Sequence, residues 1–72
     1  MTPKALAYLR GLKRIEKEAV CRKSGISIRW LENMLYARRL PSVRVARAME
    51  KATFGAITRE DLRPDINWEL IR

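Results

Sequence analysis

Two side chains suited to hydrogen bonding with base edges, Arg29 and Asn33, lie four residues apart in the middle of the chain. On a helix this spacing places them one turn apart on the same face. A guanidinium can donate two hydrogen bonds to guanine O6 and N7, and a carboxamide can pair in a similar way with adenine. The chemistry that this pair favours is therefore recognition of bases in a groove.

Catalytic chemistry is disfavoured by the composition. The 72 residues include no histidine and a single cysteine, Cys21. Without histidine the chain has no Ser-His or Cys-His pair, and without further cysteines it has neither a disulfide nor a zinc cluster. We expect no enzyme activity, no metal and no cofactor, and we interpret Cys21 as a small buried residue at a helix crossing.

The charge distribution indicates an anionic partner. The net charge is +8, and residues 1–57 carry 13 basic and 4 acidic groups, whereas residues 58–72 carry 3 and 4. Arginines outnumber lysines by 11 to 5, and the planar guanidinium matches phosphates and guanine edges. This pattern favours a nucleic-acid partner, and the alternative is a basic surface that only maintains solubility.

The periodicity of apolar residues and the capping residues predict an all-α fold. We expect one helix starting at Thr2-Pro3, then helices over 14–24, over 27–36 and from Ser42 to about Thr53, with one helical turn at 58–61. These segments fit one domain over 1–72, a compact bundle of four to five short helices. A core of this size is small, so we also expect support from a second subunit.

Each predicted helix has an apolar face that the core should cover. In the second helix this face starts at Ile15 and continues to Cys21, and in the third it is Leu31, Met34 and Leu35. In the fourth it is Val45, Met49 and Ala52.

The residues around Gly25 predict a helix-turn-helix. Cys21 lies four positions before this glycine, Ile26 follows it, and Leu31 and Met34 come six and nine positions after it. A small residue, a glycine turn and apolar anchors at these offsets suit two helices that cross at a steep angle. The alternative is an ordinary corner between two helices of a small bundle.

If this interpretation holds, residues 27–36 form the recognition helix, whose outward residues enter the major groove. Arg29 would bind guanine and Asn33 adenine, and Ile28 could contact a thymine methyl group. Glu32 could accept from cytosine N4 or instead pair with Arg29. The outward set comprises Ser27, Ile28, Arg29, Glu32, Asn33 and Tyr36.

A second set of cations is predicted to bind phosphates. Arg29 and Arg44 lie in the first turns of predicted helices, where the helix dipole disfavours a cation unless a phosphate approaches the same end. Each of these cations could instead be a solvated surface charge. The phosphate candidates are Lys17, Arg38, Arg39 and Arg44.

Several runs resemble the Cro/YdaS-like helix-turn-helix regulators of phages and prophages. The resemblance is carried by residues 8–10, 21–31, 38–42, 48–53 and, most specifically, 55–65. It implies a lambda-repressor-like domain that binds double-stranded operator DNA as a dimer. Two departures are Ala37 and Phe54, which stand where such proteins usually have glycine.

We predict that residues 54–72 form a packing and dimerisation segment. This segment is nearly neutral and rich in apolar residues. We expect Ile57 and Leu62 to pack on the core, and Phe54 and Trp68 to remain exposed as anchors of a homodimer. The alternative is that both aromatic residues close the core of the monomer.

The leading hypothesis is a sequence-specific repressor of a phage or prophage promoter. A close variant is an antitoxin-like repressor of its own operon, with a toxin as a further partner. From another class, the chain could be a basic interaction module for an acidic protein or a membrane surface. We see neither a signal-peptide pattern over residues 1–9 nor an uncharged membrane span. We therefore expect no membrane association and a location in the bacterial cytoplasm, at the nucleoid.

Overall fold

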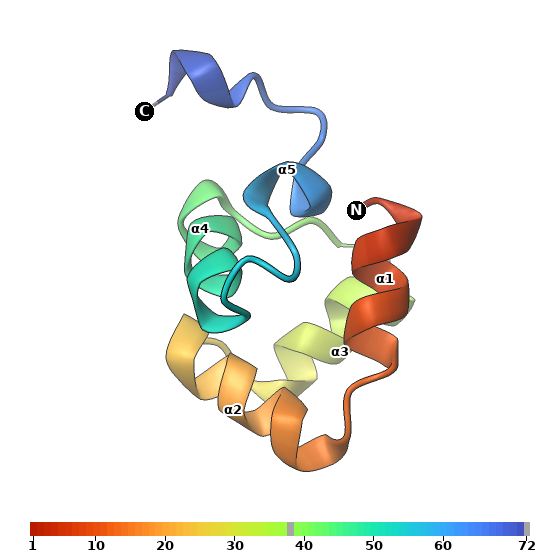
Figure 1. Cartoon of the computed structure of the whole chain (residues 1–72). Coiled ribbons are helices and arrows are strands. Elements are labelled where there is room, and N and C mark those ends of the chain that lie inside the picture. Colours follow the sequence, from red (N-terminus) through yellow and green to blue (C-terminus); the bar gives the residue numbers. More distant parts are fainter. Residues whose placement is uncertain (38, 72) are drawn as a thin grey trace.

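Figure 1 shows a computed structural model of the chain, which describes residues 1–37 and 39–71. These residues form five α helices and one short 3-10 helix and contain no strand, so the predicted all-α class is confirmed. The elements are α1 (Pro3–Arg10), α2 (Arg14–Ser24), α3 (Ile28–Tyr36), α4 (Val43–Ala52), α5 (Arg59–Leu62) and η1 (Trp68–Leu70).

Hydroxyl side chains start four of the helices, at the positions that the sequence predicts. Thr2, Ser27, Ser42 and Thr58 each accept a hydrogen bond from the backbone N–H three residues later, at 3.0 to 3.3 Å. Each bond satisfies one of the donors that a helix start leaves without a partner. These caps fix where α1, α3, α4 and α5 begin, and with them the direction from which each helix enters the core.

The turn between α2 and α3 is a Schellman motif centred on Gly25. The Ile26 N–H donates to the carbonyl of Cys21 at 3.0 Å, and Gly25 adopts a left-handed φ of 73°. Glycine meets no Cβ penalty in this conformation, which explains its presence at the turn. The motif ends α2 sharply and allows α3 to start at Ser27.

The same motif recurs at the end of α4, but with phenylalanine in the glycine position. The Gly55 N–H donates to the carbonyl of Glu50 at 2.9 Å, and the Phe54 N–H donates to that of Lys51 at 3.1 Å. Phe54 has a φ of +53°, in the left-handed region. The departure from glycine at this position therefore places a side chain where the backbone favours none.

The core lies between the five α helices, and α2 contributes to it where it packs on α4 and α3. Full burial of a large apolar side chain contributes about 1.5–3 kcal/mol relative to its exposure, so a small set of residues holds the bundle together. Ala52, predicted on the inner face of α4, is only partly buried. The largest fully buried apolar side chains are Leu9, Leu31, Met34, Leu35, Met49, Ile57 and Leu62.

The predicted burial of Ile15 was wrong, because this side chain is 74% exposed. Ile15 lies in the first turn of α2, whereas the buried residues Val20, Cys21 and Ser24 lie in the second half of the helix. Only that half packs against the neighbouring helices. The buried face of α2 is therefore shorter than the apolar face that the sequence predicts.

The predicted exposure of Trp68 was also wrong, since it is 7% exposed. Its indole N–H donates to the carbonyl of Arg63 at 3.0 Å, and the guanidinium carbons of Arg47 and Arg59 lie 5.9 and 5.6 Å from the ring centroid. The physical reason is that the segment after Pro64 turns back, so the indole gains both packing and a hydrogen-bond acceptor. The C-terminal segment lies beyond α5 in Figure 1. Ile57 and Leu62 are fully buried, as predicted.

Candidate nucleic-acid interface

The two faces of α3 differ completely in exposure. Leu31, Met34 and Leu35 are 0% exposed, and they hold the helix against the core. The residues at positions i, i+3, i+4 and i+7 of the opposite face are all exposed, which leaves one continuous polar stripe along the helix. These residues are Arg29, Glu32, Asn33 and Tyr36.

The N-terminal end of α3 is less open than the sequence predicts. The Ser27 hydroxyl oxygen accepts from the Trp30 N–H at 3.0 Å, so its proton is the part still free to donate. Ile28 and Trp30 are partly buried and pack against the core. Of the six predicted base-reading residues, Ile28 is the one that the core partly covers.

Arg29 and Glu32 could have neutralised each other, but within the described residues no ion pair joins them. Both side chains therefore keep their hydrogen-bonding capacity for an external group. The Arg29 guanidinium remains an unneutralised cation in the first turn of α3, where the helix dipole repels it. An anion bound near this helix end would relieve that repulsion.

Sequence reasoning missed Arg10, which connects α1 to the end of α3. Its Nη2 donates to the carbonyl oxygen of Leu35 at 2.9 Å, and its guanidinium carbon lies 5.4 Å from the ring centroid of Tyr36. The signal in the sequence is indirect: α3 has no basic residue in its last turn and no glycine after it. The final carbonyls of α3 are therefore open to a cation from another segment, and Arg10 is such a cation.

Ala37 can occupy the position after α3 because the backbone there is not left-handed. Its φ is −98°, and its N–H donates to the carbonyl of Asn33. An alanine adopts this conformation without strain. The chain thus ends α3 with the help of Arg10 instead of a glycine.

Three of the four predicted phosphate ligands lie within the described residues. Arg44 is exposed in the first turn of α4, and its Nη1 lies 3.8 Å from the position of a Cβ on Gly25, so its guanidinium covers the turn of the helix-turn-helix. Arg39 is exposed after α3, and Lys17 is partly buried on α2. Arg38 lies outside the described residues.

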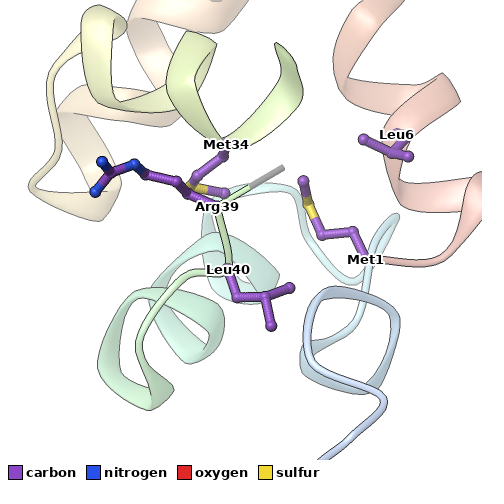
Figure 2. A pocket seen from close by; sticks show the side chains of 5 residues that line it. All are labelled: Met1, Leu6, Met34, Arg39 and Leu40. Carbon is purple, nitrogen blue, oxygen red and sulfur yellow. The ribbon is translucent and has the colours of Figure 1, made fainter. Parts of the chain in front are cut away.

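A hollow of about 310 Å³ lies beside the C-terminal end of α3. Met1 and Leu6 lie on one side of this hollow, and Figure 2 shows that the Arg39 guanidinium points away from them. The other lining residues are apolar, so the hollow lacks the converging polar groups that orient a ligand. We assign no ligand to it.

Cys21 is 3% exposed at the crossing of α2 with its neighbours. Burial, followed by the negative charge of Glu18, raises the pKa of its thiol above the ordinary value. A raised pKa favours the unreactive protonated thiol, so Cys21 serves packing.

No helix in residues 1–37 and 39–71 combines the length and the apolar character needed to cross a membrane.

Comparison with known proteins identifies one family. A family model described as bacterial toxin YdaS matches residues 16–71, from the first turn of α2 to the residue after η1. Neither the curated proteins nor the solved structures yielded a match to the chain.

Proposed function

The chain belongs to the YdaS family of small helix-turn-helix-like phage and prophage proteins, and on this premise we propose that it is a transcriptional regulator that binds double-stranded operator DNA. The observation that carries the proposal is the exposed stripe of α3 opposite three side chains that are 0% exposed. A helix held so firmly by one face presents the other in a fixed orientation, which base recognition requires.

The exposed stripe of α3 would read the major groove. Arg29, in the first turn, suits a bidentate contact with guanine, and Asn33, one turn later, suits adenine. Arg10 positions the far end of the helix through the Leu35 carbonyl and the Tyr36 ring. The two ends of the recognition helix are thereby fixed by the Ser27 cap and by α1.

Phosphate contacts would supply most of the affinity. The chain carries a net charge of +8, and each phosphate neutralised by Lys or Arg releases a counterion. Arg44 is the best-placed candidate, because it covers the α2–α3 turn from the start of α4. Lys17 lies on α2 and Arg39 follows α3.

We further propose that the DNA-bound form is a two-fold dimer joined through residues 54–72. One recognition helix reads few base pairs, whereas two helices spaced by about 34 Å would read a palindrome. With Trp68 in the core, the tail offers Leu70 and Ile71, which are 79% and 38% exposed, and Arg47 donates to the Ile71 carbonyl and so holds the tail on α4. Leu70 and Ile71 are therefore the candidate dimer contacts, and Phe54 is a further exposed apolar residue of the same segment, at 90% exposure.

The experiment that tests the DNA proposal is selection of bound sequences from a random double-stranded pool. We expect enrichment of a palindromic site by the intact protein and loss of that enrichment in the double variant Arg29→Ala, Asn33→Ala. Arg22→Ala is the matched control, because it removes an exposed cation from α2 outside the α3 stripe. No enrichment by the intact protein would refute sequence-specific binding. Equal enrichment in all three proteins would refute base recognition by Arg29 and Asn33.

The printed description of the matched family, bacterial toxin YdaS, favours a second candidate role in a toxin–antitoxin pair. The chain would then be a toxin, or an antitoxin-like repressor of its own operon. Induced expression in a bacterial host distinguishes these roles: a toxin slows growth, whereas an autorepressor lowers expression of a reporter behind its own promoter. If Arg29→Ala abolishes the growth effect, toxicity acts through DNA.

A membrane-surface role is less favoured by the packing. The apolar residues of α1 and α2 that a lipid surface would need include Leu9, Val20 and Cys21, and all three are buried in the core. An amphipathic helix binds a bilayer through its apolar face, so these helices would have to leave the bundle first.

A further inference from the structure

We propose that the surface around Phe54 docks an acidic, partly apolar segment of another protein. This surface, here termed the Phe54 patch, lies where the C-terminal ends of α2 and α4 meet (Figure 1). It comprises Lys23, Ala48, Lys51, Ala52 and Phe54, which line a hollow of about 290 Å³.

The backbone of the turn at Phe54 would suit glycine better than phenylalanine. The motif at Gly25 makes the same pair of backbone hydrogen bonds without a side chain. Phe54 adopts the left-handed φ of +53° and leaves its side chain 90% exposed. A strained backbone and an unburied ring at one position indicate a role outside the chain.

The surroundings of the ring are apolar at the floor and cationic at the rim. Ala48 and Ala52 form the floor, and their small side chains leave the space of the hollow free. At the rim, the Lys23 ammonium lies 5.3 Å from the Phe54 ring centroid, in cation–π range. None of the residues that line the hollow is acidic. Glu50, the carboxylate of α4, instead faces the Arg59 guanidinium at 3.9 Å.

This charge pattern disfavours a second copy of the chain as the occupant. A two-fold interface pairs each patch with itself, which would bring Lys23 and Lys51 of one subunit against the same cations of the other. Like charges that face each other across an interface repel and so act against this pairing. The dimer contact then falls to Leu70 and Ile71, and Phe54 is left for a different partner.

DNA is disfavoured by position and by chemistry. Arg44 stands at the start of α4 and Phe54 just beyond its end, and a helix of 10 residues is about 15 Å long. The rim lysines could pair with a phosphate as well as with a carboxylate, but DNA offers no apolar side chain for the floor of the hollow, whereas an aromatic anchor is typical of the centre of a protein interface. The fitting occupant places one bulky apolar side chain in the hollow and carboxylates on Lys23 and Lys51.

The test uses the full chain and a defined probe, a fluorescent synthetic peptide built of Glu, Leu and Ala with one acidic and one apolar face. Fluorescence anisotropy measures its affinity for the intact protein, for Phe54→Gly and for Lys23→Glu. Phe54→Gly keeps the left-handed turn, so the variant remains folded. We expect at least a tenfold loss of affinity in each variant, and a similar loss when Gln replaces Glu in the peptide.

Arg22→Glu is the matched control, because it makes the same charge change one residue away and outside the hollow. We expect its peptide affinity to stay within twofold of the intact protein, and the operator affinity of Phe54→Gly to remain unchanged. Equal losses in Arg22→Glu and Lys23→Glu would mean unspecific charge attraction and would overturn the proposal. A drop in the operator affinity of Phe54→Gly would also overturn it. The same holds if Phe54→Gly sediments as a monomer under conditions in which the intact protein is a dimer.

Discussion

The Arg10 guanidinium donates to the backbone carbonyl of Leu35 at 2.9 Å, which joins α1 to the last turn of α3. The two residues are 25 positions apart in the sequence. The same guanidinium lies over the Tyr36 ring. The end of the candidate recognition helix is therefore set by a residue outside the helix-turn-helix.

Arg10→Ala should weaken operator binding by about tenfold, or about 1.4 kcal/mol, because the end of α3 loses its fixed orientation. A charge-assisted hydrogen bond contributes about 1.5–3 kcal/mol when shielded, and Arg10 is exposed, so we expect at most about 1 kcal/mol of lost stability. A positioning residue should leave the salt dependence of binding unchanged. A fall in the salt slope by about one unit would show that Arg10 instead contacts a phosphate.

Arg29→Ala and Arg44→Ala should weaken DNA binding in different ways. Loss of Arg29 should cost about 1–3 kcal/mol on the operator and remove the preference at one base position. Loss of Arg44 should weaken specific and unspecific DNA alike and reduce the salt slope by about one unit. Titrations of both variants on operator and unrelated DNA at several salt concentrations provide the check. Identical behaviour would contradict the division into base-reading and phosphate-binding residues.

Phe54→Gly should stabilise the protein by about 0.5–1 kcal/mol, because glycine escapes the left-handed penalty of about 1–2 kcal/mol but loses more chain entropy on folding. The matched change Gly25→Ala should destabilise by about 1 kcal/mol for the converse reason. The space at Gly25 admits a Cβ, since its nearest neighbour would be Arg44 Nη1 at 3.8 Å. Urea unfolding measures both variants. A destabilised Phe54→Gly would mean that the ring supports the fold.

Trp68→Ala should destabilise the protein by about 3 kcal/mol, because it removes a core side chain that is only 7% exposed. The variant also loses the ring over which the guanidinium groups of Arg47 and Arg59 lie. Trp68→Phe should recover part of this loss, since it keeps the apolar ring but not the N–H that donates to Arg63. Thermal unfolding checks the order. Equal stability of the Ala variant and the intact protein would mean that Trp68 is not part of the core.

Acid should destabilise the C-terminal part of the fold. The Thr58 backbone N–H lowers the pKa of Asp61, and hydrogen bonds from the Arg63 side chain lower the pKa of Asp65 to about 2. A carboxylate with a lowered pKa stabilises the fold above its unfolded value of about 3.9, and this contribution is lost as the pH falls toward the folded value. Stability should therefore drop between about pH 4 and pH 2. Asp61→Asn should show a shallower drop in urea midpoint across this range, and an unchanged slope would count against the capping role.

The local features of the chain could be predicted from the sequence because each depends on a few neighbouring residues. Ser27 caps α3 three residues away, Gly25 adopts the left-handed turn that only glycine favours, and the spacing of Leu31, Met34 and Leu35 selects the buried face of α3. Helix starts, helix ends and apolar periodicity are short-range properties. The exposed stripe with Arg29 and Asn33 follows from them.

Only the tertiary structure decided the contacts between distant segments. The contact of Arg10 with Leu35 requires α1 to lie against the end of α3, and no local pattern encodes that approach. Trp68 is buried because the segment after Pro64 turns back toward Arg63, whereas Ile15 is exposed because α2 packs through its second half alone. An apolar side chain alone does not determine its own burial. Burial depends on which surface another segment reaches, and that is settled only when the helices pack.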